Sequence, residues 1–261
     1  MIKVAGHIGK AIILRANSFC GTLVFAIRIF LNFFDRRTYN SASKMVFTQQ
    51  FYTTSLQILP MFLVVAVIFG FLFNFMAFQA VKNEGLADSI RRLLMGFVVT
   101  ELSPFVTVLL VALRSSAAIN AEMIVMKVNR EMNTLERFRI DPARYLFAPR
   151  MLSGMVSVVL LTGLFALTVV FTGLLISNPV YGTSVDAYID TLLHYVDIPD
   201  IVITLFKCGT FGFFITLIPI RNGLNVPQEL TDIPFTVLNG MVKVFMAIVT
   251  IEVLSSIIRF I

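Results

Sequence analysis

Long runs of apolar residues dominate the pattern of hydrophobic and polar positions along this chain. The runs cover residues 56–79, 93–119, 151–176, 201–220 and 235–261. Each approaches or exceeds the roughly 20 residues that an α-helix needs to cross a hydrocarbon core about 30 Å thick. The pattern therefore predicts an all-α integral membrane protein with five transmembrane helices in a single domain over residues 1–261.

The N-terminal stretch, residues 1–37, combines a helical apolar period with scattered basic residues. The apolar positions are Ile8, Ile12, Phe19, Leu23, Ile27, Phe30 and Phe34, and the basic ones are Lys3, Lys10, Arg15, Arg28, Arg36 and Arg37. An arginine at mid-bilayer depth costs about 3 kcal/mol or more. The pattern favours an amphipathic helix lying in the membrane interface over a sixth span.

A second amphipathic helix is predicted between the second and third spans, over residues 122–138. Its apolar stripe comprises Val125, Val128, Met132, Leu135 and Phe138, and charged residues cover much of the remaining surface. Asp141-Pro142 ends the segment, because the residue before proline is pushed out of the α region. The helix either packs on the cytoplasmic end of its own protein or docks into a groove on a soluble partner.

Composition and charge agree with the membrane assignment and indicate an orientation. Only 14% of the residues are charged, whereas soluble domains average about 25%. The net charge of +6 arises largely beside the apolar runs, in residues 1–50 and 120–150, while the 177–200 loop carries aspartates without lysine or arginine. The positive-inside rule therefore places the N-terminus in the cytoplasm and the C-terminus on the opposite side, and it explains the basic charge without nucleic acid.

Three ionisable residues lie inside predicted spans at one depth. Glu101, Lys207 and Glu252 are each about 10–14 Å below the outer surface, at 1.5 Å per helical residue. Charges of complementary sign at one level predict a buried ion cluster, although each side chain could instead reach separately for the outer interface. We expect the cluster to hold the outer helix ends together without carrying out chemistry.

Catalytic and metal chemistry have little support in the sequence. His7 and His194 lie on opposite sides of the membrane in the predicted topology, and Cys20 and Cys208 form no recognisable disulfide or metal framework. The chain has no Gly-x-x-x-x-Gly-Lys-Ser/Thr loop to hold nucleotide phosphates. We expect no catalytic residue, metal or cofactor in this chain.

The most specific motifs lie between residues 101 and 150. They are Glu101-Leu102-Ser103-Pro104, the run from Leu113 through Ala117-Ala118 to Met123, Met132-Asn133-Thr134-Leu135-Glu136, Ile140-Asp141-Pro142-Ala143-Arg144-Tyr145-Leu146 and Ala148-Pro149-Arg150. In sequence and order they resemble the signature of the MlaE/YrbE permeases, the membrane subunits of MCE-associated ABC lipid transporters. The family tends to have glycine where this chain has Ser103 and Arg139, and arginine or glutamine at Thr100.

The resemblance implies a homodimeric permease in the cell inner membrane, with an ABC ATPase, which binds ATP and Mg, on the cytoplasmic face. It also implies an MCE-domain protein on the periplasmic face and a phospholipid cargo. The ATPase-coupling residues would be Glu122, Val125, Val128, Arg130, Met132, Leu135 and Glu136. A lipid pocket would lie near Phe73, Phe75 and Phe97.

Two other functions fit the same residues. The chain could be the permease of another class of ABC exporter, which carries a small amphiphile and needs no MCE protein. It could also be a membrane scaffold that anchors soluble proteins through residues 120–150 without transport. A channel is disfavoured, because no run of polar residues lines a span.

Overall fold

The computed structural model describes residues 21–22, 24–33, 35, 40–83, 96–181, 198–225 and 233–260. Every regular element within these ranges is helical. Five helices are long and apolar enough to cross a membrane, as the sequence predicts: Ser41–Met76, Val98–Val128, Ala143–Ile176, Pro199–Leu224 and Pro234–Ile258. The protein is therefore a multi-pass membrane protein.

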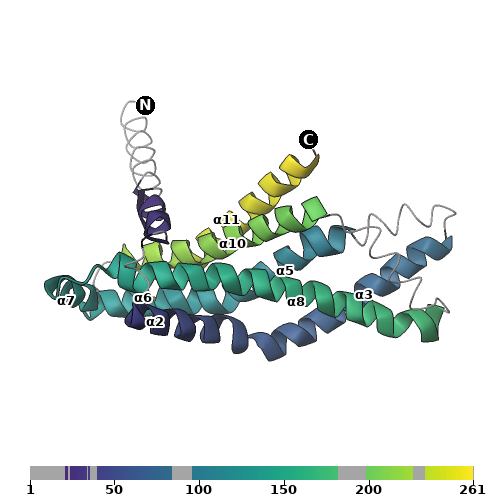
Figure 1. Cartoon of the computed structure of the whole chain (residues 1–261), viewed down its shortest axis with the longest axis horizontal. Coiled ribbons are helices and arrows are strands. Elements are labelled where there is room, and N and C mark those ends of the chain that lie inside the picture. The colour runs from purple at the N-terminus through teal and green to yellow at the C-terminus, as the bar shows by residue number, and fades with distance from the viewer. Residues whose placement is uncertain are drawn as a thin grey trace.

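Spans one to three combine α-helices with single turns of wider π-helix, whereas spans four and five are α-helical throughout. In chain order the elements are α2 (Ser41–Phe51), η2 (Tyr52–Leu56), α3 (Leu59–Asn83), η3 (Val98–Leu102), α5 (Ser103–Val111), η4 (Ala112–Ser116), α6 (Ala117–Val128), α7 (Glu131–Arg137), η5 (Ala143–Phe147), α8 (Ala148–Tyr181), α10 (Ile198–Leu224) and α11 (Ile233–Phe260). Figure 1 shows them as an elongated bundle with α7 at one end.

The first span starts at Ser41 in the structure, well before the predicted residue 56. Polar residues between these positions lower the hydropathy, but several of their side chains are hydrogen-bonded within the protein. Gln50 Nε2 donates to Thr54 Oγ1 at 3.0 Å, and Ser55 Oγ donates to Ser157 Oγ at 2.7 Å. A helix can extend through such residues when each polar group has a partner.

Helix α8 is the centre of the bundle and packs against α10, α3 and α2. At its crossing with α10, a Cβ on Gly212 would collide with the backbone of Met155 and Gly154. Small residues allow two helix backbones to approach in this way within a membrane. A hydrogen bond also joins spans two and four, in which Ser116 Oγ donates to the Ile215 carbonyl at 2.7 Å.

Two buried apolar clusters divide the bundle along its length. One contains Phe62, Phe165 and Phe211 among the transmembrane helices, and the other contains Ile29, Met132 and Met151 near α7. The N-terminal helix, Val24–Phe33, contributes Ile29 to the second cluster. Most of the predicted interfacial helix, residues 1–20, lies outside the described residues.

Helix α11 is the least buried of the five spans. It contacts α10 and α6 but leaves the bundle toward its C-terminal end, as Figure 1 shows. Its exposed apolar side chains include Leu238, Val242, Met246, Val249 and Val253. This surface needs lipid or protein to cover it.

Candidate functional site

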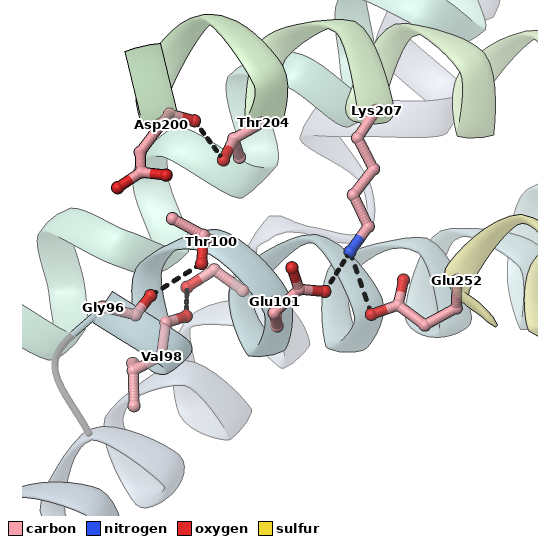
Figure 2. Close-up of polar contacts among 9 residues, drawn as sticks. Gly96, Val98, Thr100, Glu101, Asp200, Thr204, Lys207 and Glu252 are labelled. Carbon is pink, nitrogen blue, oxygen red and sulfur yellow. Dashed lines mark hydrogen bonds and ion pairs between the residues drawn. The ribbon is translucent and has the colours of Figure 1, made fainter. Parts of the chain in front are cut away.

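The ion cluster predicted from the sequence is present. Lys207 Nζ lies 2.5 Å from Glu101 Oε2 and 2.9 Å from Glu252 Oε1. The three residues come from α10, η3 and α11, so a single ammonium joins three different spans, as Figure 2 shows. The Lys207 side chain is 3% exposed, and those of Glu101 and Glu252 are 12% and 19% exposed.

Burial gives this cluster its energetic importance. Charges removed from water lose hydration, and only good mutual geometry compensates for that loss. Removing one partner of such a buried pair typically costs about 3–5 kcal/mol, because an uncompensated charge remains. Lys207 is therefore the residue on which the cluster depends, since it faces two carboxylates.

Two departures from the family pattern next to Glu101 have local hydrogen bonds. Thr100 Oγ1 donates to the Gly96 carbonyl at 2.8 Å, which is drawn in Figure 2, and Ser103 Oγ donates to the Val98 carbonyl at 2.8 Å. Both acceptors belong to the start of the second span, where the π-turn η3 shifts the backbone hydrogen bonds. The two hydroxyls thus stabilise the turn that presents Glu101.

The predicted docking helix 122–138 is two segments rather than one. Its first part is the end of α6, which is also the end of the second span, and its second part is α7. Arg130 separates them with a left-handed φ of 57°, and Arg139 closes α7 with a φ of 58°. A left-handed residue ends an α-helix, so a single continuous helix is excluded.

The residues proposed for coupling divide between surface and core. Val125, Arg130 and Glu136 are exposed, whereas Met132 is buried and Leu135 packs against the second apolar cluster. Val128 is half-buried. Only the exposed side chains are accessible to a partner.

Two further features of this end concern predicted residues and their neighbours. Phe138 and Ile140 are exposed at 73% and 40%, so this end carries exposed apolar side chains besides Val125. Glu122 accepts from Arg150 Nη2 at 2.5 Å, which ties α6 to the start of α8. The Ala148-Pro149-Arg150 motif singled out Arg150 in the sequence, but the sequence did not show that Arg150 binds Glu122.

A polar cluster also joins α6 to α10 and α11. Asn222 Nδ2 lies 3.3 Å from Asn120 Oδ1 and 2.9 Å from the Thr236 carbonyl, and Lys243 Nζ donates to Asn222 Oδ1 at 2.8 Å. Gly240 permits this approach, because a Cβ there would meet the Asn120 amide. This cluster was not predicted from the sequence, since isolated asparagines in apolar runs do not reveal their partners.

The three phenylalanines proposed for a lipid pocket face different surroundings. Phe73 packs against the transmembrane core and stacks on Phe69 at 6.1 Å between ring centroids. Phe75 and Phe97 are exposed, at 53% and 51%. The structure of one chain therefore leaves Phe75 and Phe97 available to lipid or a partner, whereas Phe73 is partly buried against the core.

Metal ligands do not gather in the described part of the chain. Among these residues no group of three or more His, Cys, Asp or Glu side chains could hold a metal ion. His7 and His194 lie outside the described residues. The polar side chains described above form contacts between helices.

Comparison with known proteins identifies the family. The family described as Permease MlaE matches residues 47–258. A probable ABC transporter permease protein of Synechocystis is 28% identical, over 62% of each chain, so the match covers less than two thirds of that relative. A probable ABC transporter permease protein of Rickettsia felis is 24% identical over 85% of each chain.

A third relative carries a more specific description. The intermembrane phospholipid transport system permease protein MlaE of Haemophilus influenzae is 26% identical over 67% of each chain. The family match covers the ion cluster, the α6–α7 segment and all five candidate spans except the first residues of span one. This chain therefore belongs to the MlaE permease family.

Proposed function

We propose that the chain is the transmembrane permease subunit of an ABC transporter that moves phospholipids between the inner membrane and a periplasmic MCE protein. A separate ATPase subunit supplies the energy, and this chain hydrolyses nothing itself. The observation that carries the proposal is the family match over residues 47–258, and the similarity to a relative described as a phospholipid transport permease supports it.

The arrangement of the α6–α7 segment supports docking of the ATPase. Helix α6 packs against α10 and α11 and leads into α7, which lies at the end of the molecule in Figure 1. Val125, Phe138 and Ile140 expose apolar surface there, and Arg130 and Glu136 add charge. Exposed apolar anchors with a charged rim are typical of a protein–protein interface.

The exposed face of α11 supports a homodimer. A single chain leaves this span largely uncovered, although lipid could also cover it. In the dimer, the phospholipid would enter near the outer ends of the spans, where Phe75 and Phe97 are exposed. The ion cluster would fix the helices beside that site, and the N-terminus and α7 would face the cytoplasm.

The decisive experiment is transfer of a fluorescent phospholipid in proteoliposomes. The chain is coexpressed with its ATPase and MCE protein, reconstituted, and supplied with ATP. We expect transfer that requires ATP and the MCE protein and that stops with a hydrolysis-deficient ATPase. ATP-dependent movement without any need for the MCE protein would indicate a general exporter, and no movement in an assembled complex would indicate a scaffold.

The docking surface is tested by Phe138→Asp with Phe138→Leu as its matched control. The aspartate places a charge in the apolar patch, so we expect the ATPase to be lost from the purified complex. Leucine keeps the apolar contact and is expected to retain the ATPase. Full copurification with Phe138→Asp, in a normally folded chain, would exclude this surface.

A further inference from the structure

A groove lies near the α7 end of the molecule, away from the predicted cargo site at the outer ends of spans one and two. It is a cavity of about 300 Å³ lined by Phe33, Ser43, Lys44, Phe47, Thr48, Ala148, Pro149 and Leu152. Its walls come from the N-terminal helix, α2 and the start of α8. Its volume is at the lower end of the range of about 300–1,000 Å³ for small-molecule sites.

Contacts beside the groove fix the positions of the elements that form its walls. Arg28 pairs with Asp141 at 3.4 Å, and Arg144 pairs with Asp35 at 3.3 Å, which ties the N-terminal helix to the turn before α8. The rings of Phe25 and Phe147 add an apolar contact at 5.8 Å between centroids. The groove is thus preformed by interactions that do not involve its own lining.

The groove lies at the membrane surface. Lys44 begins the first span, and no charged residue follows until Lys82. A lysine at this position marks the level of the lipid headgroups, and its ammonium reaches toward them. Beside Lys44 the groove is lined by apolar side chains such as Phe47 and Leu152, which suit contact with an acyl chain.

The charge of Lys44 is available to a ligand. Its side chain is exposed, and within the described ranges no carboxylate lies at ion-pair distance from its ammonium. The nearby Asp35 and Asp141 are paired with arginines. A cation at the mouth of an apolar groove complements a molecule with one negative group and a hydrocarbon tail.

We propose that this groove binds an anionic phospholipid of the adjacent leaflet, with one acyl chain against Phe33, Phe47 and Leu152 and the phosphate beside Lys44. The lipid is a bound structural component rather than the transported cargo. It fills the space between the N-terminal helix and spans one and three. The proposal depends only on the membrane location of the chain, so it stands or fails independently of the transport function.

Native mass spectrometry of the delipidated chain tests the proposal. The protein is titrated with phosphatidylglycerol and, separately, with phosphatidylcholine that has the same acyl chains. The first bound lipid is expected to prefer phosphatidylglycerol about fivefold, the effect of one lysine near a lipid phosphate. Lys44→Gln should remove the preference, whereas Lys44→Arg should keep it.

Two further substitutions separate the groove from general lipid adhesion. Thr48→Trp, at an exposed position on the rim, should fill the groove and abolish the first binding step with either lipid. Met45→Trp adds the same ring on the exposed side of α2, and Arg137→Gln removes a distant exposed charge, so both should bind like the parent chain. Unchanged binding with Thr48→Trp, or equal losses in Lys44→Gln and Arg137→Gln, would overturn the proposal.

Discussion

Lys207 shows how much one residue can determine in a membrane interior. Its ammonium is shared by carboxylates from two other spans, so three helices that are distant in sequence meet at one point. Counting residues from the ends of apolar runs was sufficient to predict this contact, because a rigid helical rise converts sequence position into depth. The sequence could not predict the distances, which depend on how the helices rotate about their axes.

The charge balance of the cluster gives the first prediction. Lys207→Met leaves Glu101 and Glu252 facing each other without a cation, and we expect poor assembly and loss of transport. The triple variant Glu101→Gln, Lys207→Met, Glu252→Gln carries no charge at this site. Because breaking a buried pair costs about 3–5 kcal/mol while replacing all its charges is often neutral, the triple variant should be the more stable.

The amount of folded, monodisperse protein and the midpoint of thermal unfolding in detergent measure this difference. Lys207→Arg serves as the control that retains a cation. If Lys207→Met is as stable as the parent chain and transports normally, the cluster has no role in holding the helices.

Arg139 gives a second prediction at this scale. It closes α7 with a φ of 58°, and the amides of Arg139 and Ile140 donate to the carbonyls of Glu136 and Leu135 at 2.9 and 3.0 Å. A left-handed conformation costs a side-chain-bearing residue about 1–2 kcal/mol, which glycine avoids. The family tendency toward glycine here thus has a conformational explanation.

We expect Arg139→Gly to slow hydrogen exchange across residues 131–140. Phe138→Gly is the matched control, since Phe138 has a φ of −80° and gains nothing from glycine. That control should exchange faster than the parent chain. Faster exchange in Arg139→Gly would show that the Arg139 side chain stabilises the turn by more than its left-handed backbone conformation costs.

At the scale of helices, apolar run length predicted the number and order of the spans but not their ends or internal irregularities. The first span begins earlier than predicted because Gln50, Thr54 and Ser55 satisfy one another or Ser157. The division of 122–138 at Arg130 had no strong sequence signal, because neither glycine nor proline stands there. The Asn120–Asn222 contact depends on which helix faces meet, and one sequence alone does not contain that information.

The crossing of α8 and α10 gives a third prediction. Gly212→Ala places a methyl group against the Met155 and Gly154 backbone, which cannot move aside as a flexible side chain could. Overpacking of this kind costs about 1–3 kcal/mol, so the midpoint of thermal unfolding should fall. Gly163→Ala on α8, where an added Cβ meets no atom within 4 Å, is the control and should leave the midpoint unchanged or higher.

At the scale of the whole molecule, the distribution of charge predicts an orientation that the helices alone do not determine. Residues 120–150 are rich in lysine and arginine, and the 177–200 loop is acidic. We expect Arg137→Cys to react with a membrane-impermeant maleimide only from the cytoplasm, and Asp190→Cys only from the periplasm. The labelling would be done in a background without Cys20 and Cys208, and the reverse pattern would invert the topology.

The second span, which ends with α6, forms one helical rod of 31 residues, Val98–Val128, about 46 Å long at 1.5 Å per residue. This rod carries Glu101 near one end and Val125 near the other, so a rigid tilt of the helix would move both ends together. A tilt of about 5° at the α7 end displaces the far end by about 4 Å over this length. The π-turns η3 and η4 are the points along the rod where it can bend. Stiffening either turn should therefore change how much of a displacement at one membrane surface reaches the other surface.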